Sequence, residues 1–465
     1  LAVLDRRPAP GQPRDYDFPA FERSSLRNGL GLLCCHVPGR PLLQAQLIVR
    51  GDAGGGGTSE AAEHAGATVL MARAMSEGTT ERDAVAFVEA AERLGAEMRA
   101  SAGWDSLSVN LEVPRSRLAA AMALFAELAL SPSFPEREVE RLREERLNDL
   151  QQVMADARRR AEKAFPAVVY ADGVPYARPL GGVAETVSRL DREIVAARHA
   201  ALMRPDAATL IVCGDLDAVP VENMVEQAFG AWSGQGDAPA LGADGAPDVA
   251  AADRRVVVVD RPEAPQSEIR VGHVGTARQT HDFHALSVMN ALLGGLFNSR
   301  LNMLLREERG YTYGVNSSFD MRRAAGPFAV RCAVESDVTA PAVADIMAEL
   351  GRIGQDQVSD EELDAARDYL IGVFPLRFET SAQVAGALSG LVVHGLPDDE
   401  LDRYRPAVAA VRADDVRAAA HAHVDAERAS IVIVGDAARC EAELREAGYG
   451  EVEVIHDEGF GPADE

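Results

Sequence analysis

Arg306 and Tyr313 stand seven residues apart, and their types and spacing point most directly to chemistry in this sequence. An arginine guanidinium can hold a carbonyl or carboxylate oxygen through charge-assisted hydrogen bonds. A tyrosine hydroxyl can donate a hydrogen bond to the negative charge that develops on a reacting oxygen. The pair could therefore bind and stabilise such an oxygen, provided that the local structure brings both side chains to one place.

The elements predicted around the pair are a helix and a strand. Residues 301–309 carry leucines at the helical period, residues 311–319 alternate as a strand does, and Gly310 lies between them. We expect Arg306 in the last helical turn and Tyr313 early in the strand. Each also has an ordinary structural explanation, because an arginine near a helix C-terminus favours the helix dipole and a tyrosine in a strand often only packs.

The chain contains an internal repeat, which is seen by comparing segments half a chain apart. TLIVCGDLD from Thr209 corresponds to SIVIVGDAA from Ser430, and each is predicted to be a buried strand that ends in Gly-Asp. Two homologous domains are the simplest explanation. We place them at residues 1–232 and 254–465, joined by a linker at residues 233–253 that is rich in Gly, Ala, Asp and Pro.

The order of elements within each half indicates an α+β fold. It runs from strands through helices and further strands to a long helix pair and a last strand. Residues 105–113 alternate apolar and polar side chains, as a half-buried strand requires. A helix that begins near Glu136 carries one apolar stripe. We therefore expect, in each domain, an antiparallel sheet that helices cover on one face.

The sequence resembles the insulinase/pitrilysin metallopeptidases, the inverzincin family, from about Phe21 to Gly435. The family-like stretches are LRE…RG…Y around Arg306, GAEMRASAGWDSLSV from Gly95, PYARPLGG from Pro175 and MRPDAATLIVCGDLD from Met203, in that family's order and spacing. The resemblance implies two αβ-roll domains with the metallohydrolase fold of the mitochondrial processing peptidase. It further implies that Arg306 and Tyr313 enter an active site whose zinc is bound elsewhere.

The family binds zinc through H-x-x-E-H in the first helix of the N-terminal domain, and this sequence lacks those ligands. Aligning Gly66 and Gly78-Thr79 to the family pattern places Val69, Ala72 and Arg73 at the three ligand and base positions. The third ligand, a glutamate of a later helix, aligns with Asp149 or Gln152. A catalytic zinc needs about three His, Cys, Asp or Glu ligands, so we expect no zinc in this chain. Arg73 and Asp149 are predicted to form an ion pair instead, with Glu145 in a salt bridge on its helix.

The resemblance to a bacterial branch of the family implies a subunit role. Some of its members work as pairs, in which one chain carries zinc and the other keeps only the arginine and tyrosine. This chain is expected to be the second type, with a zinc-bearing homologous subunit and a peptide substrate as its partners. Tyr313 would donate to the oxyanion and Arg306 would hold a backbone carbonyl or terminal carboxylate. Val315 and Ser317, in an edge strand, would bind the peptide by strand addition.

Other functions remain open on the sequence alone. The chain could be an inactive scaffold, or a peptide-binding or chaperone subunit of a larger assembly, and neither would need Arg306 or Tyr313. The segment from Glu60 to His64 differs from H-x-x-E-H by one residue, but it follows a glycine run and is expected to be a polar loop. His421 and His423 are two residues apart, which places them on different helix faces. No G-x-S-x-G, Walker or dinucleotide motif is present.

Composition limits the remaining classes of function. The formal net charge of -26 argues against nucleic acid or an anionic membrane as a partner, and no apolar run is long enough to span a membrane. The five cysteines are odd in number and lack CxxC spacing, which indicates reduced thiols. A cytoplasmic location is expected on this ground, whereas a periplasmic or secreted one would follow if a segment before Leu1 had been removed.

Overall fold

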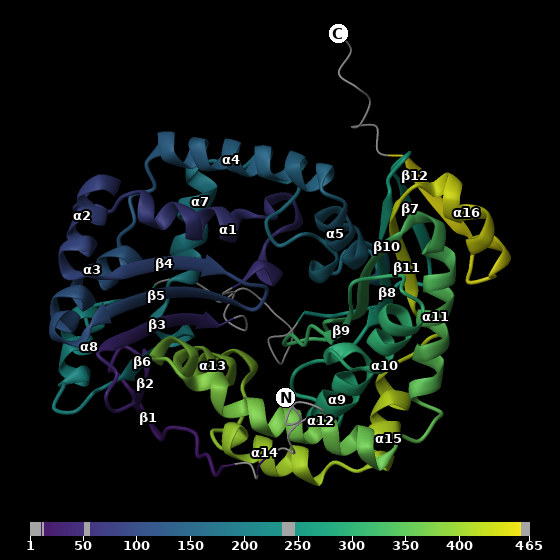
Figure 1. Cartoon of the computed structure of the whole chain (residues 1–465). Helices are drawn as coiled ribbons and strands as arrows, with labels where there is room; N and C mark the ends of the chain where they lie inside the picture. The colour runs from purple at the N-terminus through teal and green to yellow at the C-terminus, as the bar shows by residue number, and fades with distance from the viewer. Residues whose placement is uncertain (1–10, 12–13, 51–55, 235–246, 457–465) are drawn as a thin grey trace, which may run out of the picture.

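The computed structural model of the chain describes residue 11 and residues 14–50, 56–234 and 247–456. In these residues the strands form two six-stranded sheets, one in each half of the chain, and helices pack against both (Figure 1). The α+β class with two repeated units is confirmed, and each half adopts the fold of the family described below.

The first half contains the strands β1 (Phe21–Ser25), β2 (Gly31–His36), β3 (Leu42–Arg50), β4 (Glu97–Ala102), β5 (Ser106–Pro114) and β6 (Ala208–Gly214). Its helices are α1 (Ala67–Ala74), α2 (Ala84–Leu94), α3 (Leu118–Leu130), α4 (Glu136–Ala155), α5 (Ala157–Val169), α6 (Ala184–Val187), α7 (Arg192–Leu202) and α8 (Val221–Phe229).

The second half contains the strands β7 (Val256–Asp260), β8 (Gln266–Val274), β9 (Val315–Phe319), β10 (Pro327–Glu335), β11 (Ser430–Gly435) and β12 (Val452–His456). Its α-helices are α9 (Phe283–Asn290), α10 (Arg300–Asn302), α11 (Thr339–Ile353), α12 (Asp360–Val373), α13 (Ser381–His394), α14 (Glu400–Ala410), α15 (Ala413–His423) and α16 (Ala437–Glu446). Two π-helical segments, η8 (Ala291–Gly295) and η9 (Met303–Glu308), flank α10.

The strand orders show the repeat directly. The sheets run β1-β2-β6-β3-β5-β4 and β12-β7-β11-β8-β10-β9, so the inner order of the first sheet recurs in the second. The expectation of purely antiparallel sheets is wrong, because β2 pairs in parallel with β6, and β7 pairs in parallel with both β11 and β12. In each half a long run of helices precedes the late strand, β6 or β11, and parallel pairing needs a long connection of this kind.

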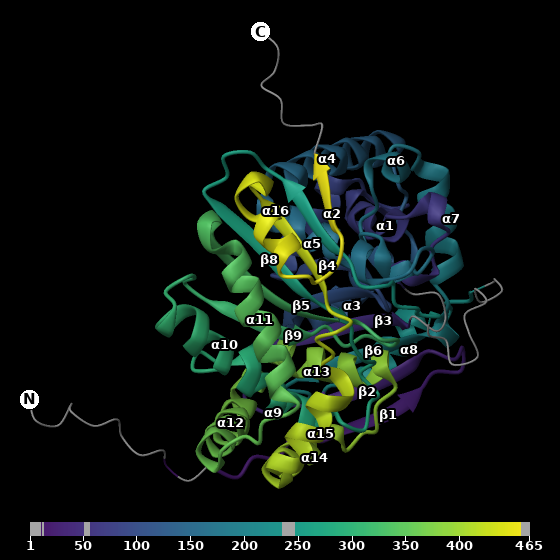
Figure 2. The same ribbon diagram turned by 90° about the vertical axis from the view of Figure 1, so that its right-hand side faces the viewer.

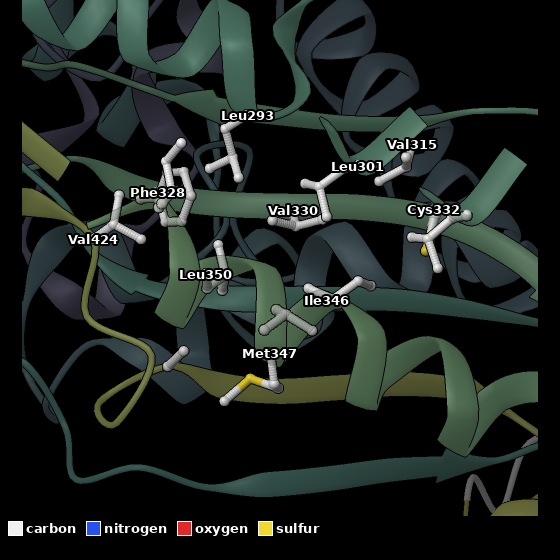
Figure 3. Close-up of a cluster of buried hydrophobic side chains, with 14 of the residues drawn as sticks. Leu293, Leu301, Val315, Phe328, Val330, Cys332, Ile346, Met347, Leu350 and Val424 are labelled. Carbon is white, nitrogen blue, oxygen red and sulfur yellow. The ribbon is translucent and has the colours of Figure 1, made fainter. Parts of the chain in front are cut away.

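One face of each sheet carries the larger core of its half. In the second half, Phe328, Val330 and Cys332 of β10 pack against Ile346 and Leu350 of α11 (Figure 3). Figure 2 shows α11 and α16 on the outer side of this sheet. The alternation predicted for β5 is present, since its residues are alternately buried and partly exposed along the whole strand.

The opposite face of each sheet is covered by a helix from the other half, so the expectation of a single covered face is wrong. Phe165 and Val168 of α5, a first-half helix, pack on Val257 and Val432 of the second sheet. Leu388 of α13, a second-half helix, packs within a cluster of buried side chains from the first sheet: Leu33, Cys35, Ile48, Ile211 and Cys213. The two halves therefore exchange equivalent helices.

The exchange begins at a break between α4 and α5. The helix predicted to begin near Glu136 ends at Ala155, and Asp156 caps α5 by accepting a hydrogen bond from the backbone N–H of Arg159 at 2.8 Å. The extended backbone of Asp156 redirects the chain towards the second sheet.

An ion pair between a buried arginine and a partly exposed glutamate anchors α5 on the second sheet. Arg270 of β8 is 1% exposed, and its Nε donates to Glu162 of α5 at 2.9 Å while its Nη1 donates to Glu268 at 2.9 Å. Arg331 of β10 contacts the same Glu162 carboxylate, with its Nε 3.2 Å from Oε1. Two strands of the second half thus hold one carboxylate of the first.

The predicted linker is described only at its ends, since residues 235–246 lie outside the described residues. Its C-terminal end contacts the first half, where the N–H of Ala252 donates to the carbonyl of Val169 at 3.0 Å. The domain boundaries at residues 232 and 254 stay a prediction. Among the described residues, no helix is both long and apolar enough to cross a membrane.

Candidate functional site

Arg306 lies in the π-helical segment η9 and not in a regular helical turn. The segment is fixed on its inner side by Leu301 and Leu305, which are both fully buried. π-Helical turns are energetically unfavourable and occur often at functional sites. The predicted placement of Arg306 near the end of a helical stretch is therefore right, and the type of helix was not predictable from the leucine period.

Contacts on two sides hold the Arg306 side chain. Its guanidinium carbon lies 3.7 Å from the ring centroid of Phe297, and its Nη2 lies 3.0 Å from Oε1 of Glu307. The side chain is 25% exposed. A guanidinium stacked on an aromatic face keeps its edge donors free for a planar acceptor such as a carboxylate.

Tyr313 lies in the loop before β9, which corrects the prediction that it stands in the strand. The strand begins at Val315 because Thr312 closes a turn on Gly314, with its hydroxyl donating to the Gly314 carbonyl at 2.9 Å. Tyr313 is 97% exposed, and within the described part of the chain it has no hydrogen-bond partner. A tyrosine that is neither packed nor bonded is not explained by core packing.

Val315 and Ser317 do not form the peptide-binding edge that we expected, although β9 is the edge strand of its sheet. The Asn302 side chain accepts from the N–H of Val315 at 3.1 Å and donates to its carbonyl at 2.8 Å. Ser317 is 1% exposed and so close to Gly294 that a Cβ on Gly294 would lie 2.7 Å from its nitrogen. Both residues therefore fix β9 to the helical segment, and strand addition at this point does not fit.

The positions aligned with the zinc ligands lie in α1, as predicted. Val69 is partly buried, Ala72 is 3% exposed in the core, and Arg73 points to solvent. None of the three side chains can donate an electron pair to zinc at neutral pH, so this donor set does not fit the metal that the family binds. Among the described residues, no group of three or more His, Cys, Asp and Glu side chains is arranged to hold a metal ion.

Arg73 pairs with Glu145 and not with Asp149, so the predicted Arg73–Asp149 ion pair is wrong. The Nη2 of Arg73 lies 2.8 Å from Oε2 of Glu145 on α4. Arg141 also contacts Glu145 and reaches Glu77, with its Nη2 2.8 Å from Oε2 of Glu77. The carboxylate that faces α1 is therefore one turn earlier than Asp149, and the sequence prediction missed it by that turn.

Asp149 and Gln152 face other groups. Asp149 accepts hydrogen bonds from Arg159 and Arg146, and these two guanidinium groups lower the pKa of its carboxyl. Gln152 is exposed. Among the described residues, neither forms a hydrogen bond or an ion pair with Val69 or Arg73.

The segment from Glu60 to His64 has a structural role. Glu60 is 8% exposed, and its carboxylate accepts hydrogen bonds from the backbone N–H groups of Gly66 and Thr68, the first at 2.9 Å. It thereby satisfies free donors at the start of α1.

His423 pairs with Asp282 at 2.7 Å in the second half, far along the chain from α1. The five cysteines are free thiols, as predicted.

The fold defines a class of protein: a chain of two repeated halves, each with a six-stranded sheet and helices in a metallopeptidase-like arrangement. The comparisons with known proteins agree. Residues 52–181 match the sequence model "Insulinase (Peptidase family M16)", and residues 189–370 match "Peptidase M16 inactive domain". The chain belongs to the insulinase (M16) peptidase family.

Relatives and solved structures extend this similarity. An "uncharacterized zinc protease" of Mycobacterium leprae is 26% identical over 77% of this chain and 79% of its own length. A "non-peptidase homolog" of Helicobacter pylori is 24% identical over 74% and 78%. The crystal structure of a peptidase M16 inactive domain from Pseudomonas fluorescens superposes with a TM-score of 0.80 and 23% identity over 90% of this chain and 98% of that one. Relatives of similar identity thus carry opposite descriptions, so the site itself must support the function.

Proposed function

We propose that this chain is the zinc-free subunit of a heterodimeric metalloendopeptidase, to which it supplies Arg306 and Tyr313. Its partner would be a homologous subunit that keeps H-x-x-E-H, and its substrate a peptide held between the two chains. The observation that carries the proposal is Tyr313, a large aromatic side chain that is 97% exposed and follows, seven residues later, an arginine on a π-helical turn.

The chemistry of the pair supports this role. A hydroxyl without an intramolecular partner is free to donate to an oxyanion, and removing one such donor typically costs about 3–4 kcal/mol of transition-state stabilisation. Arg306 offers the edge of a stacked guanidinium to a substrate carbonyl or carboxylate. Phe297, which is 73% exposed, extends the apolar surface next to it. A scaffold subunit has no use for a tyrosine in this position.

The replaced metal positions support the assignment to the zinc-free type. The Arg73–Glu145 ion pair joins α1 to α4 at Arg73, one of the positions that we align with the family's zinc ligands. A guanidinium at this point would repel a divalent cation. Catalytic metal therefore has to come from another chain.

The test is peptide cleavage by this chain mixed with zinc-bearing M16 homologues from the same genome. We expect no cleavage by this chain alone, cleavage by the mixture, and a fall in kcat of about a hundredfold or more for Tyr313→Phe with KM nearly unchanged. Tyr369→Phe is the matched control, because Tyr369 is also exposed, at 53%, but lies on α12. Equal kcat for Tyr313→Phe and the wild type would refute the catalytic role, and about one zinc per chain in the purified protein would refute the subunit type.

A further inference from the structure

We propose that the cleft between α5 and the β9–β10 hairpin is a binding site for acidic, partly apolar peptide segments. The cleft has a volume of about 440 Å³ and is lined from both halves of the chain. Its cations from the first half are Arg146, Arg158, Arg159, Lys163 and Arg178. Arg322 and Arg331 of the second half complete the set, against only two carboxylates, Glu162 and Asp320.

The charge of the cleft opposes that of the whole chain. The sequence has 73 acidic against 47 basic residues apart from histidine, so a random surface patch is expected to be acidic. Seven cations beside two carboxylates is the reverse, although Asp149, outside the lining, pairs with both Arg146 and Arg159. A concave surface with low-dielectric walls focuses the remaining positive field on its ligand. Cations gathered where the rest of the surface repels anions indicate an anionic ligand.

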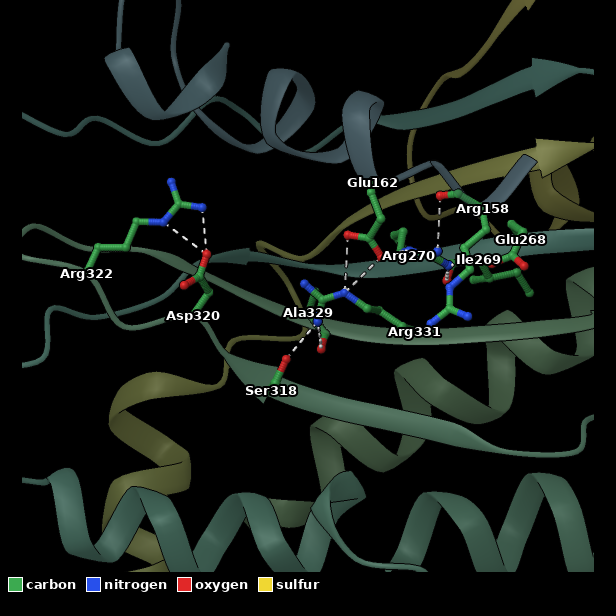
Figure 4. A network of polar contacts seen from close by, with 10 residues as sticks. All are labelled: Arg158, Glu162, Glu268, Ile269, Arg270, Ser318, Asp320, Arg322, Ala329 and Arg331. Atoms are coloured by element: carbon green, nitrogen blue, oxygen red, sulfur yellow. Dashed lines mark hydrogen bonds and ion pairs between the residues drawn. The ribbon is translucent and has the colours of Figure 1, made fainter. Parts of the chain in front are cut away.

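Arg322 is the strongest single observation. It is 7% exposed, and its guanidinium carbon lies 4.7 Å from the ring centroid of Trp104 and 4.5 Å from that of Tyr176. Its Nε and Nη2 both donate to one oxygen of Asp320, at 2.9 and 2.6 Å (Figure 4). The Nη1 is buried and has no hydrogen-bond partner among the described residues. A buried donor without an acceptor costs about 1–3 kcal/mol, so Asp320 alone does not satisfy the Arg322 guanidinium.

The other cations of the cleft are only partly neutralised. Glu162 is shared between Arg270 and Arg331, and Glu268 also pairs with Arg270 (Figure 4). Arg158, one turn before it on α5, is exposed and forms no ion pair within the described part of the chain. Charge complementarity with an acidic ligand follows from this excess.

The apolar part of the lining selects a peptide over a simple anion. Trp104, Leu150, Val153, Phe165 and Leu180 line the cleft between the cations. Leu150, Val153 and Phe165 are already buried, whereas Trp104 and Leu180 are partly exposed. A peptide that mixes Asp or Glu with Leu or Phe would cover these two side chains, which a free phosphate or a nucleic acid backbone would leave in contact with water. The net charge of -26 also disfavours nucleic acid and anionic membranes at long range.

This inference goes beyond the proposed function, because it needs neither a partner subunit nor Tyr313. Binding is measured on the full chain alone, by fluorescence anisotropy of a labelled peptide that alternates Glu and Leu. Peptides with Gln or Lys in place of Glu are the ligand controls. We expect only the Glu peptide to bind, and its affinity to fall as NaCl is raised.

Two exposed or partly exposed positions give variants that should fold. Arg158→Glu and Arg331→Gln are each expected to weaken binding of the Glu peptide about tenfold, as loss of a desolvated charge contact does. Arg137→Glu is the matched control, since Arg137 is an exposed arginine of α4 that does not line the cleft. It should change the affinity less than about twofold.

Several outcomes would overturn the inference. These are equal binding of the three peptides, unchanged affinity in Arg158→Glu, or full competition by inorganic phosphate or by phosphatidylserine vesicles at the same anion concentration. If the Glu peptide binds and the variants weaken it as expected, the cleft is a peptide-binding site. If Tyr313→Phe also supports full cleavage, the proposed function is refuted and the inference about the cleft stands. If cleavage depends on Tyr313 but the Glu peptide does not bind to the cleft, the proposed function stands and the inference about the cleft is refuted.

Discussion

The residues of the degenerate metal site show how far sequence spacing can locate a side chain. Alignment placed Val69, Ala72 and Arg73 on the first helix, and they are there. It placed the facing carboxylate at Asp149, whereas Arg73 meets Glu145. Successive turns of one helix carry equally suitable carboxylates, and the choice among them depends on how α1 crosses α4. That crossing is set by tertiary packing, which the local sequence does not encode.

The same reasoning applies to Arg306 and Tyr313. The leucine period located the helical stretch, but the π-helical geometry and the turn at Thr312 moved Tyr313 out of the strand. Val315 and Ser317 were expected to bind peptide because edge strands usually can. The Asn302 side chain prevents this by using both backbone groups of Val315, and a single asparagine gives no such signal in sequence.

The Glu145 geometry predicts that two substitutions create a zinc site. Residues 69 and 73 are one turn apart on the same face of α1, so Val69→His with Arg73→His would place two imidazoles beside Glu145. We expect the double variant to bind about one zinc per chain with a Kd that rises at least tenfold when Glu145→Gln is added. Asp149→Asn in the same background should leave the Kd unchanged. Titration with a competing chelator measures both, and sensitivity to Asp149 in place of Glu145 would contradict the geometry.

His394 predicts a loss of stability in mild acid. The pKa of its imidazole is lowered from 6.5 to about 4, mainly by burial and also by Arg278 and Arg323, against the opposing effect of Asp105. The native state therefore keeps His394 neutral while the unfolded chain takes up a proton below its ordinary pKa, so stability falls as pH drops from about 6.5 towards about 4. Between pH 7 and pH 5 this residue should account for about 1–2 kcal/mol of the loss.

Urea unfolding at both pH values measures this contribution. His394→Gln removes the titration, so its free energy of unfolding should depend less on pH than that of the wild type. His281→Gln is the control, because the His281 side chain is 92% exposed. An identical pH dependence in the wild type and His394→Gln would show that the native imidazole is not held neutral.

At the scale of elements, the sequence predicted the repeat and its strand and helix types but not which sheet each helix covers. Helix α5 has one buried face, and the pattern of that face is equally compatible with either sheet. The exchange of α5 and α13 follows from the break at Asp156 and from the Arg270–Glu162 pair. The Asp156 cap is local, but the Arg270–Glu162 pair joins residues that lie 108 positions apart, so no local pattern contains it.

Because α13 covers the first sheet, a cavity made by truncating one of its buried side chains should expose buried thiols of the first half. Leu388 is fully buried against Cys35 and Cys213, and Leu388→Ala should destabilise the protein by about 2–5 kcal/mol. In a Cys34→Ser background we expect faster thiol labelling of Cys35 and Cys213, resolved by mass spectrometry of the peptides. Leu350→Ala on α11 is the matched control. It should speed the labelling of Cys332, which lies in the same buried core as Leu350 (Figure 3). The same labelling pattern in both variants would mean that only global unfolding exposes the thiols.

At the scale of the molecule, the two halves form one stability unit, although the sequence repeat suggests two domains. Each sheet has one face that is covered by a helix of the other half, so either half alone would expose a large apolar surface. Exposed patches of this kind cause aggregation. We therefore expect the intact chain to unfold in one calorimetric transition, with equal van't Hoff and calorimetric enthalpies.

Fragments divided in the predicted linker test this dependence. A fragment of residues 1–240 made alone should be insoluble or lack a cooperative transition, because the face of its sheet around Ile48 and Ile211 loses α13. Co-expression with residues 241–465 should restore a soluble complex, because α5 and α13 each regain their sheet without a covalent link. The matched control is the same co-expression with Leu388→Ala and Phe165→Ala, which weaken the two exchanged helices and should lower the yield of complex. A fragment of residues 1–240 that folds cooperatively by itself would show that the helix exchange contributes little, and would make each repeat an independent domain.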